Sequence, residues 1–182
     1  LSNSKSYVVH LSCRESLETV KIAREKNIDM IVETCPQYLL LEDNLYNKDK
    51  FEGAKYVMSP PLRKKEDINY LWEGLSSGDI QTVGTDHCSF NFKGQKDLGI
   101  DDFSKIPNGA PGVEHRLALL YTYGVLENRI SVNKFVEVTS TNAAKIFGMY
   151  PKKGEIAVGS DADIVILNIN KEETISYRSE ER

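Results

Sequence analysis

The residues best suited to chemistry follow two strand-like segments of this chain. Asp86 follows the segment 80–83, and His10 follows the apolar segment 7–9. A carboxylate and an imidazole are groups that bind a divalent metal or move a proton. In parallel sheets, active sites are built at the carboxyl ends of the strands. The two residues therefore predict the beginning of a metal-hydrolase site.

Each of these side chains also has a structural alternative. His10 can bind a metal, cap the next helix or hydrogen-bond a backbone group. Asp86 can be a metal ligand, a general base or the N-cap of a turn. His87 would point away from Asp86 on an extended strand, which favours a structural role. His115 lies within an expected helix, where a solvated or packing role is favoured.

Two loop segments offer further binding groups. Ser59 precedes two prolines, which lack an N–H, so nearby backbone groups are free for a small polar ligand, or the segment is a rigid turn. Asn108 lies in the turn-prone segment 107–112. Glu33 and Cys35 flank the exit of another expected strand, and either can face the site. The cysteines show no nucleophile pattern.

The order of elements predicts a parallel α/β sheet. Strands are expected at 7–11, 28–34 and 80–84, with helices at 12–26 and 65–77 between them. Strand, helix, strand, helix, strand is typical of βα units, whose strands are parallel.

Helix boundaries and the last third of the chain follow from local signals. Ser12 and Glu15 have the spacing of a capping box, while Asn27 and Gly78 are suited to end helices. Further helices are expected at 113–127, 132–138 and 142–147. A β-hairpin is expected at 154–167 around Ser160, which places a domain boundary near Pro151 and divides the chain into 1–150 and 151–182.

The composition is that of a globular domain. The 182 residues are 40% hydrophobic and 27% charged, and the formal net charge of −4 argues against general nucleic-acid binding. No apolar run approaches the ~20 residues of a membrane span. Three cysteines without zinc-finger spacing fit a reducing cytoplasm. The chain begins at Leu1, without Met, and is interpreted as a piece of a longer protein.

Seven segments, in order, resemble the cyclic-amide amidohydrolases, above all the dihydropyrimidinase and D-hydantoinase family. They are VHLS (9–12), ETCPQY (33–38), YVMSPPLR (56–63), GTDHC (84–88), IPNG (106–109), TSTNAAKIF (139–147) and GEIAVGSDAD (154–163). The resemblance implies a TIM barrel, the (β/α)₈ fold, with a small β-sandwich. This chain would supply the carboxyl-terminal half, from about strand six to strand eight, and the start of the returning sandwich.

The resemblance also implies a site with two divalent metal ions, commonly zinc, bridged by a carboxylated lysine. His10 matches the last of four histidine ligands, and Asp86 matches the aspartate that is both ligand and proton carrier. Ser59 and Asn108 match the residues whose backbone groups hold the cyclic amide. The other ligands have no counterpart in this chain, so the chain alone is expected to be inactive.

The implied activity is ring opening of a dihydropyrimidine or hydantoin to an N-carbamoyl amino acid, as in pyrimidine degradation. The implied partner is a small cyclic amide, with neither nucleic acid nor membrane, and the family forms homo-oligomers, commonly tetramers. Allantoinase and dihydroorotase are alternative activities. A non-catalytic assembly protein related to dihydropyrimidinase is the alternative of another class, and the presence of both His10 and Asp86 argues against it.

Overall fold

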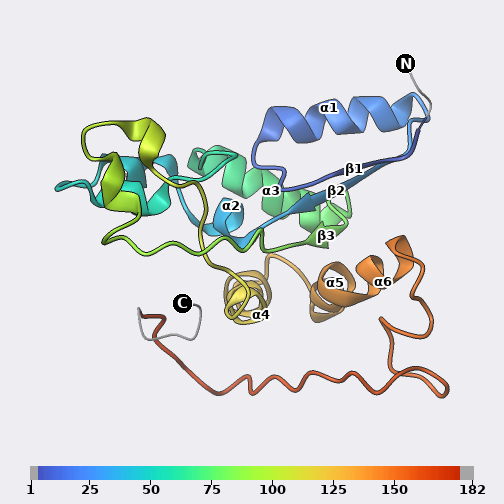
Figure 1. The fold of residues 1–182 in the computed structure, drawn as a ribbon. Coiled ribbons are helices and arrows are strands. Elements are labelled where there is room, and N and C mark those ends of the chain that lie inside the picture. The colour runs from blue at the N-terminus through green and yellow to red at the C-terminus, as the bar shows by residue number, and fades with distance from the viewer. Residues whose placement is uncertain (1–3, 177–182) are drawn as a thin grey trace.

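A three-stranded parallel sheet organises the computed structural model, which describes residues 4–176 (Figure 1). Its strands are β1 (Ser6–Val8), β2 (Met30–Thr34) and β3 (Thr82–Val83), side by side in that order. Two helices, α1 (Arg14–Glu25) and α3 (Lys65–Ser77), connect them. The predicted βα units and parallel strands are therefore confirmed, although the strands are shorter than expected.

The N-cap of helix α1 lies one residue later than the capping-box spacing predicts. Its N-cap is Cys13, without a side-chain capping bond, so the predicted capping box is wrong. Ser12 is buried, and its hydroxyl accepts a hydrogen bond from Arg63 Nε at 3.4 Å instead. The first turn is held by another helix, because the Arg14 N–H donates to Asp67 Oδ1 at 2.9 Å. Asn27, at φ 59°, ends the helix region as predicted.

The chain between β2 and α3 is a series of short helical turns. It contains α2 (Pro36–Leu40), η1 (Asp43–Asn47) and η2 (Glu52–Tyr56). Proline is well suited to the first position of α2. An N–H at that position would have no acceptor within the helix, so its absence costs no hydrogen bond. Gly78, at φ 91°, closes α3 as predicted.

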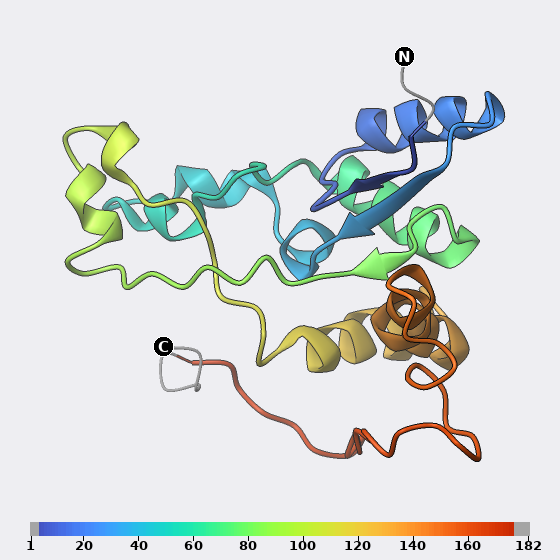
Figure 2. The same cartoon turned by 45° about the vertical axis from the view of Figure 1, so that its right-hand side comes forward.

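After β3, a long loop leads into a helical segment. The loop contains η3 (Lys96–Gly99) and η4 (Phe103–Lys105). The helices are α4 (Arg116–Leu120), η5 (Tyr121–Leu126), α5 (Val132–Val136), η6 (Glu137–Thr141) and α6 (Asn142–Ile146), where η5 and η6 have the wider π-helical hydrogen bonding. The predicted helices are present, but η6 joins the last two without a break. In Figures 1 and 2 the helices from α4 to α6 lie below the sheet, and α1 lies above the sheet.

The segment after α6 contains no strand in residues 147–176, so the predicted β-hairpin is wrong in this structure. Isolated strands are unstable, because their N–H and C=O groups need a partner strand. The apolar side chains expected to face a core are exposed, with 91% of Ile166 accessible. In Figure 2 the chain runs as an extended tail beneath the helices. The division at residue 150 and the β-sandwich stay predictions.

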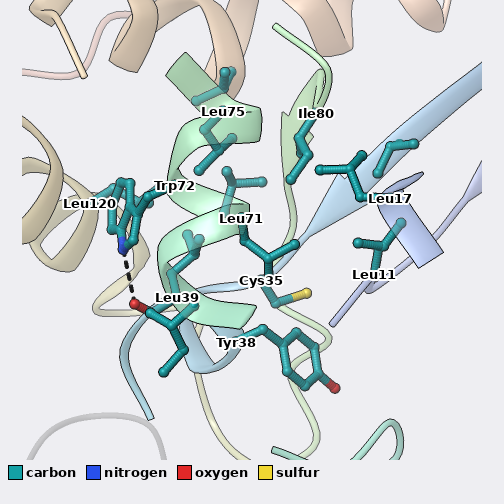
Figure 3. Close-up of a cluster of buried hydrophobic side chains, with 14 of the residues drawn as sticks. Leu11, Leu17, Cys35, Tyr38, Leu39, Leu71, Trp72, Leu75, Ile80 and Leu120 are labelled. Carbon is teal, nitrogen blue, oxygen red and sulfur yellow. Dashed lines mark hydrogen bonds between the residues drawn. The ribbon is translucent and has the colours of Figure 1, made fainter. Parts of the chain in front are cut away.

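The core lies between α1, α3 and the sheet (Figure 3). Leu71 and Leu75 of α3 are fully buried with Leu17 of α1. Burial of each such side chain stabilises the fold by roughly 1.5–3 kcal/mol. Gly74 allows the two helices to approach, because a Cβ there would lie 2.7 Å from Leu17 Cδ2. Trp72 donates from its indole N–H to the Leu39 carbonyl at 2.9 Å, which ties α3 to α2.

One arginine fixes the amino ends of β2 and β3. Arg24 donates to the Met30 carbonyl through Nε at 2.9 Å and to the Asp79 carbonyl at 2.8 Å. It also donates to Gln81 Oε1 at 2.8 Å, and the same amide oxygen accepts from the Val32 N–H at 2.9 Å. Burial lowers the pKa of Arg24, with Asp79 acting in the opposite direction. These hydrogen bonds hold the amino ends of β2 and β3 together. They do not involve the carboxyl ends of the strands, where the candidate site residues lie.

None of the helices in residues 4–176 is both long and apolar enough to cross a membrane.

Candidate functional site

The predicted metal-site residues lie at the same edge of the sheet. His10 follows β1 and Asp86 follows β3, and the three strands are parallel, so both residues stand beyond carboxyl ends. Backbone pairing continues past the strands, because the Leu11 N–H donates to the Glu33 carbonyl at 2.8 Å and the Gly84 N–H to the Thr34 carbonyl at 2.9 Å. Strand β2 lies between β1 and β3, so the axes of β1 and β3 are about 10 Å apart.

The backbones of both residues are strained. His10 has φ 40° and Asp86 has φ 47°, in the left-handed region that favours glycine. A residue with a Cβ pays roughly 1–2 kcal/mol for this conformation. Such residues concentrate at active sites, where the surrounding structure holds them against the strain. The left-handed turn ends the extended strand at each position and redirects the following chain.

The donor set fits part of a metal centre. An imidazole and a carboxylate are ordinary ligands for zinc and other divalent ions. In residues 4–176, however, no three histidine, cysteine, aspartate or glutamate side chains form a group able to hold a metal. His10 and Asp86 can therefore supply ligands to a site that needs further groups from elsewhere.

Glu33 is partly buried and faces Tyr7 and Thr82 across the sheet. Tyr7 Oη donates to Glu33 Oε2 at 2.8 Å and lies 2.7 Å from Thr82 Oγ1. Burial raises the pKa of Tyr7 to about 12, with Thr82 lowering it and Glu33 raising it. Gly84 makes room for this group, since a Cβ there would lie 2.6 Å from the Glu33 carboxyl carbon.

Cys35 is fully buried and is not a nucleophile. Burial raises the pKa of its thiol, and the charges of Glu33 and Asp86 raise it further. A thiol held in its neutral form is a poor nucleophile.

The neighbouring histidines have structural contacts. His87 Nδ1 accepts hydrogen bonds from the Gly112 N–H at 3.2 Å and from the Val113 N–H at 3.4 Å. Cys88 continues this pairing, with its N–H donating to the Ala110 carbonyl at 3.1 Å. These bonds hold the loop beside Asp86, in agreement with the predicted structural role of His87. The side chain of His115 is largely buried, and its Nε2 lies 3.8 Å from Glu114 Oε2.

Ser59 and Asn108 lie together although they are 49 positions apart in the sequence. Ser59 Oγ donates to Asn108 Oδ1 at 3.1 Å, and both residues are exposed. The loops that carry them follow β2 and β3 respectively, which places them on the side of the strand carboxyl ends. Within the described chain, neither the Ser59 N–H nor the Asn108 N–H donates to another backbone group. Two backbone donors are thus available beside a fixed pair of side chains.

Side chains after β2 connect this pair to the Asp86 loop. Gln37 Nε2 donates to the Thr85 carbonyl at 3.2 Å. Tyr38 Oη donates to the Pro60 carbonyl at 3.0 Å, next to Ser59. Gln37 and Tyr38 are not among the predicted site residues, and neither is Lys96, whose burial depends on distant segments. A hollow of about 520 Å³ near α4 is lined by none of the four predicted site residues.

Comparison with known proteins gives one consistent result. The family model described as "Amidohydrolase family" matches residues 5–181. A D-hydantoinase from Geobacillus stearothermophilus is 52% identical over 97% of this chain and 37% of its own length. The predicted carboxyl-terminal position within a longer protein stays a prediction.

Solved structures agree. The D-hydantoinase from a Bacillus species, strain AR9, superposes with a TM-score of 0.94 at 54% identity, over 98% of this chain and 39% of that one. The dihydropyrimidinase from Brevibacillus agri NCHU1002 superposes with a TM-score of 0.85 at 54% identity, over 88% and 35%. The chain therefore spans just over a third of the length of these relatives.

Proposed function

Because this chain belongs to the amidohydrolase family, we propose that its full-length protein hydrolyses a cyclic amide, opening a hydantoin or dihydropyrimidine ring to an N-carbamoyl amino acid. The relatives named D-hydantoinase and dihydropyrimidinase support this substrate class. The observation that carries the proposal is the placement of His10 and Asp86 at one sheet edge, each in a strained backbone.

The proposal includes a larger fold. The three parallel strands would be consecutive strands of a (β/α)₈ barrel, which takes about 250 residues and so needs chain beyond these 182. Residues 1–150 would belong to the barrel, and residues 151–182 would begin a small β-sandwich. The apolar side chains exposed after residue 155 would be covered by the rest of that sandwich. We further propose a cytoplasmic homo-oligomer.

The metal centre would hold two divalent ions, with zinc and a carboxylated lysine as the finer proposal. Bound divalent ions supply a hydroxide nucleophile at neutral pH and polarise the amide carbonyl. His10 would bind as a neutral imidazole, and Asp86 would bind through one carboxylate oxygen. The second oxygen of Asp86 would accept the proton of the attacking water and return it to the ring nitrogen as the C–N bond breaks.

Ser59 and Asn108 would hold the ring. Their free backbone groups can hydrogen-bond the two polar sides of an imide, and the bond between their side chains fixes the distance between the two loops. Orientation of this kind reduces the entropy that the reaction must otherwise lose. Dihydroorotase and allantoinase activities would use the same centre with different ring contacts.

The test uses the full-length protein, loaded with zinc. Dihydrouracil and a 5-substituted hydantoin are offered separately, and the N-carbamoyl product is measured with the Asp86→Asn variant as control. Ring opening that depends on Asp86 supports the proposal. A fully metal-loaded protein that opens neither these rings nor dihydroorotate nor allantoin would favour the non-catalytic alternative.

A further inference from the structure

Lys96 is a buried cation outside the proposed metal centre. Only 3% of the residue is exposed, although it lies in the long, polar loop between β3 and α4. Burial lowers the pKa of its ammonium group, with Cys88 acting in the opposite direction. Within the described residues 4–176, no carboxylate forms an ion pair with it. Burial of a charge is costly unless specific contacts compensate.

Its ammonium group is directed at one backbone carbonyl. Lys96 Nζ donates to the Val57 carbonyl at 2.8 Å and lies 5.9 Å from the centre of the Phe90 ring. Hydrogen bonds from a charged donor are about twice as strong as neutral ones, and an aromatic face attracts a cation. These two contacts compensate for the burial of the Lys96 ammonium group, which has no carboxylate partner within residues 4–176.

The Val57 carbonyl is where two loops meet. It accepts a second hydrogen bond, from the Gly109 N–H at 3.1 Å. Val57 stands two residues before Ser59, and Gly109 follows Asn108 directly. One carbonyl oxygen therefore joins the segments that carry both members of the hydrogen-bonded pair, and Lys96 fixes that oxygen from a third segment.

Packing keeps the third segment in place. A Cβ at Gly99 in η3 would lie 2.1 Å from Ile106 Cγ1, so η3 is in close contact with the chain just before Asn108. Gly109 has φ 146°, and a Cβ there would lie 2.7 Å from the Cys88 carbonyl oxygen. Small displacements of Lys96 would therefore be transmitted to both loops.

We propose that Lys96 is a positioning residue, which sets the separation of Ser59 and Asn108 so that their backbone groups meet both sides of a ring amide. This inference rests on the proposed function. Lys96 touches neither the substrate nor the metals. Its effect is on binding geometry, which acts on the ground state and the transition state alike and so appears chiefly in KM.

The experiment compares Lys96→Met with Lys93→Met in the zinc-loaded, full-length protein. Lys93 is an exposed lysine of the same loop, so it is a matched control. For Lys96→Met we expect KM for the cyclic amide to rise about tenfold with kcat within about threefold of the parent, and metal content unchanged. Lys96→Arg, which keeps a charged donor, should restore most of the affinity. Unchanged KM, or a loss explained by lost metal, would overturn the inference.

A second measurement is independent of catalysis. Amide hydrogen exchange in segments 56–60 and 106–110 should become faster together in Lys96→Met and remain at the parent rate in Lys93→Met. If Lys96→Met does not fold, Lys96→Gln, which keeps a neutral donor, should show the same coupled change to a smaller extent. Unchanged exchange in both segments would refute the role of Lys96, whereas absence of ring opening in the parent protein would refute only the proposed function.

Discussion

Ser59 Oγ donates a hydrogen bond to Asn108 Oδ1 across 3.1 Å, and so joins a loop after β2 to a loop after β3. The two residues stand 49 positions apart, and each belongs to a segment rich in proline and other turn-forming residues. Such segments are rigid but have no regular pairing of their own. The contact joins two otherwise independent turns, which we propose form one binding surface for the cyclic amide.

The first prediction concerns this contact. Ser59→Ala in the full-length protein should raise KM for the cyclic amide by about two- to tenfold, the effect of losing one hydrogen bond of ordinary strength. Metal content should not change, because neither residue is a ligand. Ser104→Ala is the control. Ser104 lies in the loop after β3, and its hydroxyl donates a hydrogen bond to Asp102 Oδ1, not to Asn108. Steady-state kinetics that give the two variants the same KM would contradict the role of the pair.

The second prediction separates the roles of Asp86 and His10. Asp86→Asn should lower kcat by about 10²–10⁴-fold and keep most of the metal, because it removes the proton acceptor but retains a ligand oxygen. His10→Ala should lower both metal content and rate. His115→Ala is the matched control and should keep its metal. Elemental analysis combined with kinetics distinguishes these outcomes, and near-normal turnover in Asp86→Asn would assign Asp86 a structural role only.

The third prediction concerns the pH dependence of stability. The pKa of Tyr7 is raised by burial from 10.0 to about 12, so the folded state favours the neutral phenol. Its contribution is fully present below the unfolded value of 10.0 and is lost as the pH rises through about 12. The difference in unfolding free energy between the parent and Tyr7→Phe should therefore shrink over this range.

Urea unfolding followed by Trp72 emission measures this difference, because Trp72 is the only tryptophan and is buried. Tyr123→Phe is the control, since Tyr123 is exposed and its replacement should give no such trend. A difference for Tyr7→Phe that stays constant with pH would show that the phenol is not kept neutral by the fold.

The fourth prediction concerns two glycines of one loop. Gly109→Ala should lower the free energy of unfolding by about 1–3 kcal/mol, because φ 146° is unfavourable for alanine and its Cβ would meet Cys88. Gly112→Ala should change it by less than about 0.5 kcal/mol, since the nearest atom to its Cβ is 3.4 Å away. The same unfolding assay compares them, and equal effects would exclude close approach as the reason for Gly109.

The sequence predicted what depends on local pattern. Alternating strands and helices, and the helix ends at Asn27 and Gly78, follow from side chains within a few residues. The N-cap of α1 was misplaced by one residue, because tertiary contacts with Ser12 and Asp67 compete with the capping box. The expected hairpin failed because its apolar face lacks a partner surface in the described chain.

The candidate site was only partly accessible to such reasoning. His10 and Asp86 are visible in the sequence because each stands at the end of a strand. The contact between Ser59 and Asn108 needs two loops to fold onto each other. Lys96 is harder still, since its burial depends on a carbonyl 39 residues earlier in the chain. No pattern of neighbouring residues distinguishes it from the exposed lysines of the same loop.

The left-handed backbone conformations of His10 and Asp86 affect which substitutions evolution would favour at these two positions. Glycine would relieve roughly 1–2 kcal/mol at each position, so His10 and Asp86 cost stability that a function of their side chains would have to offset. If a related lineage lost the proposed ring opening, selection for these two side chains would end, and glycine or asparagine would then be favoured at both positions. In a relative of unknown activity, the residues at these two turns would therefore report whether its ancestors continued to be selected for catalysis.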